Sequence, residues 1–157
     1  MPDLITHFAS AYFVSRSSRF ARYRISFYLG VLLPDLTTRP LYIIFPPASR
    51  VVYSMHTPIF VFLLCLLIAE FFQRNIRAYI RIGLLLGSTL HFGLDILQKH
   101  LITSYYWLYP FSWASTDFGF WWPDQFLKIV PLWILLILMC EVSISLIHKK
   151  HKQSSLP

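Results

Sequence analysis

The sequence predicts an all-helical membrane protein, a polytopic bundle of about five helices in a single domain covering residues 1–157. Of its residues, 56% are hydrophobic and only 13% are charged, and the mean hydropathy is +0.55. This composition is far more apolar than that of a soluble domain of similar size. Each long apolar run is continuous, and backbone in lipid must satisfy its own hydrogen bonds, which favours helices over a sheet.

The individual elements follow from these apolar runs in chain order. We expect the first two segments, within residues 1–20 and 21–36, to form a helical hairpin with helices about 25 Å long at 1.5 Å per residue. Three longer runs predict the principal spans, Pro58–Phe72, Ile82–Leu97 and Ile129–Ile147. A full span needs about 20 apolar residues. The last run approaches this length by itself, whereas the other two also need flanking polar residues at the membrane interface.

The basic residues predict how the bundle is oriented. In the five-helix arrangement, ten of the fourteen Lys and Arg residues fall on one side, in residues 16–24, 73–81 and the basic tail 148–157. The positive-inside rule makes this side cytoplasmic, so residues 36–55 and 98–126 lie outside the inner (plasma) membrane together with the N-terminus. The net charge of +7 then reflects topology, which makes membrane lipids the expected partners and excludes nucleic acid.

Five ionisable side chains lie within or beside the apolar runs, and the topology predicts that they converge. His91 and Asp95, in the stretch "GSTLHFGLDIL", are four residues apart and share one helix face. Alternating helix directions bring His7, Asp35 and His56 to the same extracytoplasmic side. Ionisable groups in a membrane are costly and by default mark a functional site.

Each of these residues also has an interpretation without chemistry. His91 and Asp95 form a hydrogen bond between packed helices in that case, and Asp35 belongs to a turn that ends the second helix. His56 then caps the following helix, and His7 is an ordinary core histidine.

Three imidazoles with one or two carboxylates form a donor set that suits a divalent metal ion. Zinc binds histidine nitrogen and carboxylate oxygen and keeps a position open for water in catalytic sites, while manganese and iron accept similar donors. We therefore expect zinc as cofactor, with manganese or iron as alternatives. Asp95 or Asp35, whichever binds the ion less firmly, is the candidate catalytic base.

The order of several short motifs adds a resemblance to a known family. The stretches "LITHFASAYF", "GVLLPDL", "HTPIF", "GSTLHFGLDIL" and "YPFSW" resemble the YdjM-like family of membrane-bound, metal-dependent hydrolases over roughly residues 3–113. The resemblance implies hydrolysis and the metal ligands His7, Asp35, His56, His91 and Asp95. The ligand order is more distantly similar to that of the zinc-dependent phospholipase C and P1 nuclease group, which favours a phosphoester. The family's "PDxD" and paired-histidine patterns are incomplete here, so we expect one metal, or a partly eroded site.

The aromatic segment before the last span bears on the substrate. Residues 104–124 carry ten aromatic side chains, which prefer the lipid headgroup level and form either an anchoring belt or a lid over the site. We therefore expect metal-activated water to attack an ester or phosphoester of a lipid-like or amphiphilic substrate at the extracytoplasmic face. The alternative is a non-catalytic assembly or regulatory protein whose metal or His/Asp site is structural. Metal removal would unfold that protein but leave the enzyme folded and inactive.

Overall fold

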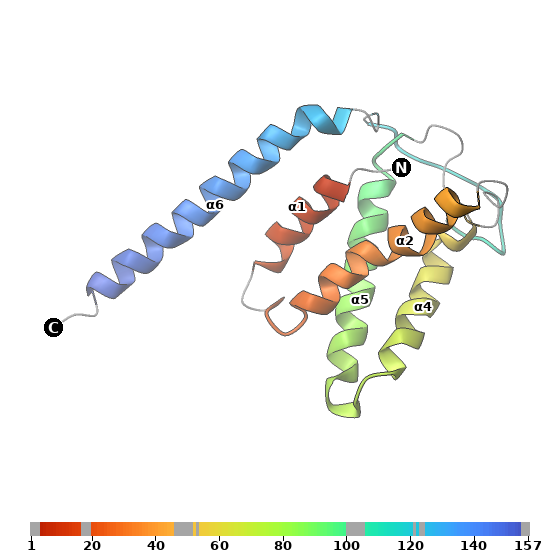
Figure 1. Ribbon diagram of the computed structural model, residues 1–157, viewed down its shortest axis with the longest axis horizontal. Coiled ribbons are helices and arrows are strands. Elements are labelled where there is room, and N and C mark those ends of the chain that lie inside the picture. Colours follow the sequence, from red (N-terminus) through yellow and green to blue (C-terminus); the bar gives the residue numbers. More distant parts are fainter. Residues whose placement is uncertain are drawn as a thin grey trace.

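The chain folds into five helices over the residues that the structure, a computed structural model, describes: 4–16, 20–45, 52, 54–99, 106–120, 122 and 125–154. These helices are α1 (Leu4–Ser15), α2 (Arg24–Ile44), α4 (Pro58–Glu70), α5 (Arg74–Asp95) and α6 (Phe126–Ser154). Successive helices alternate in direction, and α6 extends from the others as a long arm (Figure 1). No strand occurs in the described ranges, where an isolated bridge joins Tyr106 to Ser115. The all-helical prediction is confirmed.

The second helix continues beyond its predicted end, so the alternative interpretation of Asp35 as part of a turn that ends the helix is wrong. α2 runs through Pro34 and Pro40 to Ile44. Proline normally breaks a helix because it lacks the N–H that would bond to the carbonyl four residues earlier. For Pro34 that acceptor is Gly30, whose carbonyl oxygen receives the Ser88 hydroxyl of α5 at 3.0 Å instead. A neighbouring helix thus supplies the donor that the proline cannot.

Helix α5 begins eight residues before the predicted span, at Arg74 instead of Ile82. Its first turns belong to the segment expected to connect two spans. Arg77 and Arg81 in these turns form ion pairs with Glu70 at the end of α4, at 2.6 and 2.8 Å. The pairing explains how a strongly basic segment stays helical beside the turn between the two helices.

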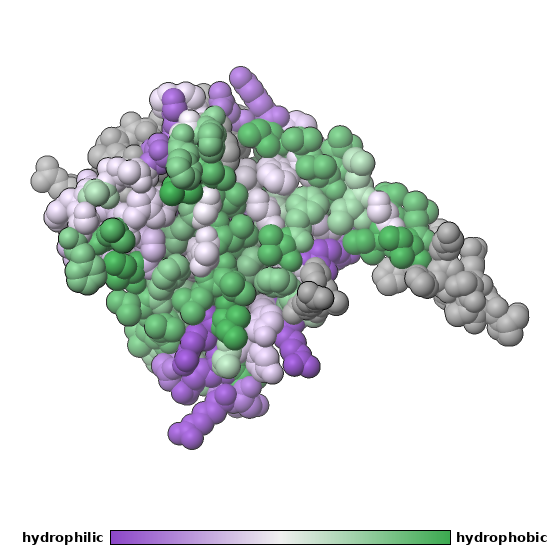
Figure 2. Space-filling view, turned by 180° about the vertical axis from the view of Figure 1, so that it is seen from behind, coloured by the Kyte–Doolittle hydropathy of each residue, from purple (hydrophilic) through white to green (hydrophobic). Residues whose placement is uncertain are grey.

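Exposed apolar surface covers much of the molecule. One helix in the described part of the chain, α6, is long and apolar enough to cross a membrane, over Lys128–Ile147, and none of this stretch is buried. Helices α1 and α4 have 12 and 13 residues, so each rises only about 18–20 Å, less than the roughly 30 Å hydrocarbon core. Figure 2 shows apolar side chains across the middle of one face and hydrophilic ones towards its lower edge. Multi-pass insertion remains a prediction.

Helices α2 and α5 form the most extensive helix contact and build the core around the site. A Cβ atom on Gly30 would lie 2.2 Å from the carbonyl oxygen of Leu84, and one on Gly87 would lie 2.1 Å from that of Phe27. Only glycine permits backbones to approach so closely. Gly93 has no such neighbour within 4 Å. The close approach brings the second half of α5 directly against the carbonyl groups of α2.

Candidate metal centre

The five side chains singled out in the sequence lie together in one buried cluster, contributed by α1, α2, α5 and the residues just before α4. At most 3% of each residue is exposed. The cluster contains two overlapping groups, and within each group the donor atoms lie within 4.8 Å of one another. The groups are His7, His91 and Asp95, and Asp35, His56 and His91. The convergence expected from the alternating helix directions is therefore observed.

The carboxylate of Asp95 lies at the centre of this cluster. Its Oδ2 atom is 3.0 Å from Nε2 of His56 and 3.2 Å from Nε2 of His91, and those two nitrogens are 3.3 Å apart. Four ligands at about 2.1 Å around a tetrahedral zinc ion lie roughly 3.4 Å from one another. The three atoms are thus spaced much as ligands of one ion would be.

Backbone carbonyls of α2 determine which nitrogen of each histidine carries its proton. Nδ1 of His91 donates to the carbonyl oxygen of Val31 at 2.8 Å, and Nδ1 of His56 donates to that of Pro34 at 3.1 Å. A carbonyl can only accept, so in the neutral rings both Nε2 atoms present lone pairs to the Asp95 carboxylate. Three acceptors this close repel one another unless a cation or an additional proton lies among them. Metal-binding histidines show the same outer hydrogen bonds.

Buried carboxylate oxygens without hydrogen bonds provide a second indication. Within the described residues, Oδ1 of Asp95 and both side-chain oxygens of Asp35 have no hydrogen bond of acceptable geometry. Leaving buried carboxylates without such partners is costly. Asp35 has an ion pair with Arg39 on its Oδ2 side, at 2.7 Å. A divalent ion fits this donor set and would supply the missing interactions.

His7 makes a different kind of contact from the other two histidines. Its Nε2 atom is 3.3 Å from the carbonyl oxygen of His91 and 3.4 Å from Oδ1 of Asp95. Both partners are acceptors, so this nitrogen acts as the donor. The arrangement favours a His7 that holds the Asp95 carboxylate in position. Its role as a metal ligand remains a prediction.

His56 does not cap the following helix, so the alternative interpretation of this residue is wrong. The residue at the cap position of α4 is Thr57, and its side chain makes no capping hydrogen bond. His56 instead faces Asp95, and its Nδ1 atom also lies 3.2 Å from the hydroxyl of Thr38, which donates to Pro34 at 2.8 Å. Thr38 was not anticipated from the sequence. Arg39 was not predicted either, although its position four residues after Asp35 could have indicated a contact.

The aromatic segment is attached to the end of α5 beside the site. The backbone N–H groups of Phe118 and Phe120 donate to the carbonyls of Ile96 and Leu97, at 2.7 and 2.9 Å. Trp107 packs against the ring of Phe92, which also contacts the rings of His56, His91 and Phe62. Within this segment, Phe111, Trp113, Phe118 and Phe120 are exposed. His100 and Asp124 lie outside the described residues, and Asp117 is not among the grouped candidate ligands.

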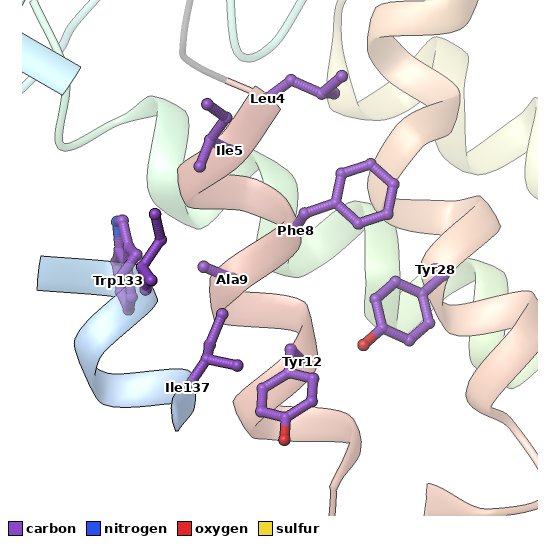
Figure 3. Close-up of a pocket in the computed structure, with 9 residues that line it drawn as sticks. Leu4, Ile5, Phe8, Ala9, Tyr12, Tyr28, Trp133 and Ile137 are labelled. Atoms are coloured by element: carbon purple, nitrogen blue, oxygen red, sulfur yellow. The ribbon is translucent and has the colours of Figure 1, made fainter. Parts of the chain in front are cut away.

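Two apolar cavities among the described residues have walls that do not include the residues of the cluster. The larger, of about 420 Å³, is lined by Met55 and Thr57 on either side of His56 and continues to Leu63 on the exposed face of α4. The other, of about 380 Å³, lies between α1 and α6. There, the Phe8 ring of α1 points towards Tyr28 of α2, and the α6 side chains Trp133 and Ile137 lie on the other side of α1, where Ala9 is (Figure 3).

Comparisons with known proteins find no matching family model, no matching curated protein and no matching solved structure. The resemblance to the YdjM-like hydrolases rests on the order of short motifs, and family membership stays a prediction.

Proposed function

We propose that the protein is a membrane-bound, metal-dependent hydrolase that cleaves an ester or phosphoester bond of a lipid-like substrate at the extracytoplasmic face. The observation that carries the proposal is the group of facing acceptors formed by Asp95, His56 and His91. The spacing of its three donor atoms suits a divalent ion. Zinc fits the nitrogen and oxygen donors best, and manganese and iron remain alternatives.

In this proposal, each residue of the cluster has a distinct role in hydrolysis. His56 and His91 present their Nε2 atoms as ligands and are held by carbonyls of α2, while His7 steadies Asp95. A bound divalent ion would lower the pKa of a water molecule and polarise the scissile phosphoryl or carbonyl group. Asp35, whose Oδ1 atom has no hydrogen bond, would then accept the proton of the attacking water.

The distribution of charge and apolar surface supports insertion of the whole bundle. The basic turn between α4 and α5 and the C-terminal end of α6 both lie in the lower part of Figure 1, and the end of α5, which carries His91 and Asp95, lies in the upper part. Exposed apolar residues of α2, α4 and α6, such as Ile25, Leu63 and Leu138, would face lipid. The short helices α1 and α4 would then be accommodated by local thinning of the bilayer.

The cavity beside His56 favours an amphiphilic substrate. Its walls are mainly apolar, and it opens along α4, where Leu63 is exposed. An acyl chain in this cavity would leave its polar end next to the cluster. The substrate would therefore reach the site laterally from the bilayer.

Metal content tests the proposed centre directly. The purified, detergent-solubilised protein should contain about one equivalent of divalent ion by elemental analysis, as expected for a mononuclear site. His91→Ala combined with Asp95→Asn should remove most of it while the helical circular dichroism is retained. Asp117→Asn is the matched control, because this carboxylate lies outside the candidate ligand groups. Unchanged metal content in the double variant would refute the centre.

A structural metal site is the competing proposal, and the near-complete burial of all five residues favours it. Chelation separates the two functions. A hydrolase should lose activity towards a chromogenic phosphodiester or ester, keep its helical circular dichroism and recover when the ion returns. Unfolding on chelation, without hydrolysis in the loaded state, would support the structural role instead.

Cysteine labelling from outside the cell tests the proposed topology. In a Cys65→Ser, Cys140→Ser background, a cysteine at Ser115 should react with an impermeant maleimide and one at Arg77 should not. Ser115 is exposed in the aromatic segment, and Arg77 lies in the basic end of α5. Labelling at position 77 but not at position 115 would reverse the orientation.

A further inference from the structure

Arg39 connects the buried cluster with the molecular surface. It lies one helical turn after Asp35 in α2, and its Nη2 atom is 2.7 Å from the Asp35 carboxylate. About 32% of the Arg39 side chain is exposed, compared with 4% of that of Asp35. A group that approaches this side of the cluster from outside therefore meets a cation first.

The charges of the centre indicate the chemical class of the substrate group that would approach Arg39. With a divalent ion bound and the histidines neutral, Asp35 and Asp95 do not compensate the ion and Arg39 completely, and a net positive charge remains. A neutral carboxylic ester would leave it unbalanced. A phosphoryl group carries the compensating charge, and its oxygens match the planar guanidinium fork.

We infer that Arg39 binds the phosphoryl group of an anionic phosphoester substrate and positions it against the cluster. The inference rests on the proposed hydrolase function and narrows its substrate to phosphoesters. Arg39 lies in the last turns of α2, at the end of the bundle where the aromatic segment is attached (Figure 1). A phospholipid headgroup and a soluble phosphoester share the required chemistry.

Chemical modification of the wild-type protein tests this assignment without a substitution. Phenylglyoxal modifies arginine, and peptide mass spectrometry follows each site. Inorganic phosphate or vesicles containing phosphatidic acid should slow modification of Arg39. Arg81 is the internal control, since it is 41% exposed and also paired with a carboxylate, that of Glu70. Phosphatidylcholine vesicles control for the membrane alone.

The variants Arg39→Gln and Arg39→Lys make the test quantitative, with Arg81→Gln as the matched substitution. We expect at least about a tenfold loss of phosphate affinity in Arg39→Gln, because the net contribution of a hydrogen bond between charged groups corresponds to about tenfold or more in affinity. Arg39→Lys should keep part of the affinity, and Arg81→Gln all of it. Thermal stabilisation by phosphate reports binding whether or not hydrolysis occurs.

Each outcome separates the two proposals. Protection of Arg39 by both probes supports a site open to soluble phosphoesters, and protection by phosphatidic acid alone assigns a lipid headgroup. Equal modification of Arg39 with and without both probes overturns the inference, as does unchanged phosphate affinity in Arg39→Gln. Phosphate binding through Arg39 without any hydrolysis would refute the enzyme but leave the anion site. Hydrolysis of a neutral ester by the wild-type protein without phosphate binding would support the enzyme but refute the anion site at Arg39.

Discussion

Replacing Gly87 by alanine should separate the two helices that hold the candidate centre. The new Cβ atom would lie 2.1 Å from the carbonyl oxygen of Phe27 and 2.7 Å from the backbone nitrogen of Val31. Non-bonded heavy atoms pack at about 3.5 Å, so α2 and α5 must move apart by roughly 1 Å. His91 is one turn further along α5, and its 2.8 Å hydrogen bond to Val31 would lengthen with this movement.

The expected magnitude combines two opposing effects. Overpacking of a close helix contact typically costs about 1–3 kcal/mol. Replacing glycine by alanine within a helix stabilises the fold by about 1 kcal/mol, because alanine has the higher helix propensity. Gly87→Ala should therefore lower the free energy of unfolding by up to about 2 kcal/mol in net terms. Gly93→Ala, which meets no atom within 4 Å, should keep the full propensity gain and become slightly more stable.

Thermal unfolding in detergent, followed by circular dichroism, measures both variants in the same preparation. A domain of this size shifts its Tm by about 2–4 °C for each kcal/mol. Gly87→Ala should fall below the wild type and lose metal, whereas Gly93→Ala should rise or stay level and keep it. A Gly87→Ala protein as stable as Gly93→Ala would show that the two helices do not approach as closely as described.

Two substitutions test further polar contacts. Thr38→Val removes a hydroxyl that lies 3.2 Å from Nδ1 of His56. We expect the metal affinity, measured in competition with a chelator, to be about tenfold weaker, since outer-shell partners of metal ligands contribute about 10–100-fold. Unchanged affinity would contradict a role of Thr38 in holding His56. Tyr12→Phe removes the hydrogen bond to Glu141 that links α1 to α6, and should destabilise the fold by about 0.5–1.5 kcal/mol in thermal unfolding; unchanged stability would show that the contact contributes nothing.

The helical fold could be predicted because it depends on composition and on long apolar runs. The helix ends could not, because they depend on partners distant in sequence. Pro34 looks like a helix end until the Ser88 hydroxyl of α5 satisfies the carbonyl that the proline leaves free. Likewise, the arginines that open α5 look like a loop until Glu70 pairs with them.

The grouping of the candidate site residues could also be predicted, because it depends on the order and direction of the helices. Alternating helices of comparable length bring polar residues near their same ends together, and the i,i+4 spacing of His91 and Asp95 required only a helix. The sequence could not indicate which ring nitrogens face inward, since that depends on the Val31 and Pro34 carbonyls of α2. The Arg39–Asp35 ion pair was not predicted, because an i,i+4 contact there requires α2 to continue past Pro34 and Asp35.

The packing of α2 against α5 and the geometry of the candidate centre depend on the same short stretch of chain. Between Gly30 and Pro34, α2 offers three carbonyl oxygens outward, which accept from Ser88, His91 and His56 in turn. A close helix contact and two oriented imidazoles therefore arise together. It follows that a substitution which loosens the contact should also weaken metal binding, whereas loss of the metal need not open the contact, because the glycine packing and the Ser88 hydrogen bond do not involve the ion. This asymmetry favours a centre that can be emptied without unfolding the bundle.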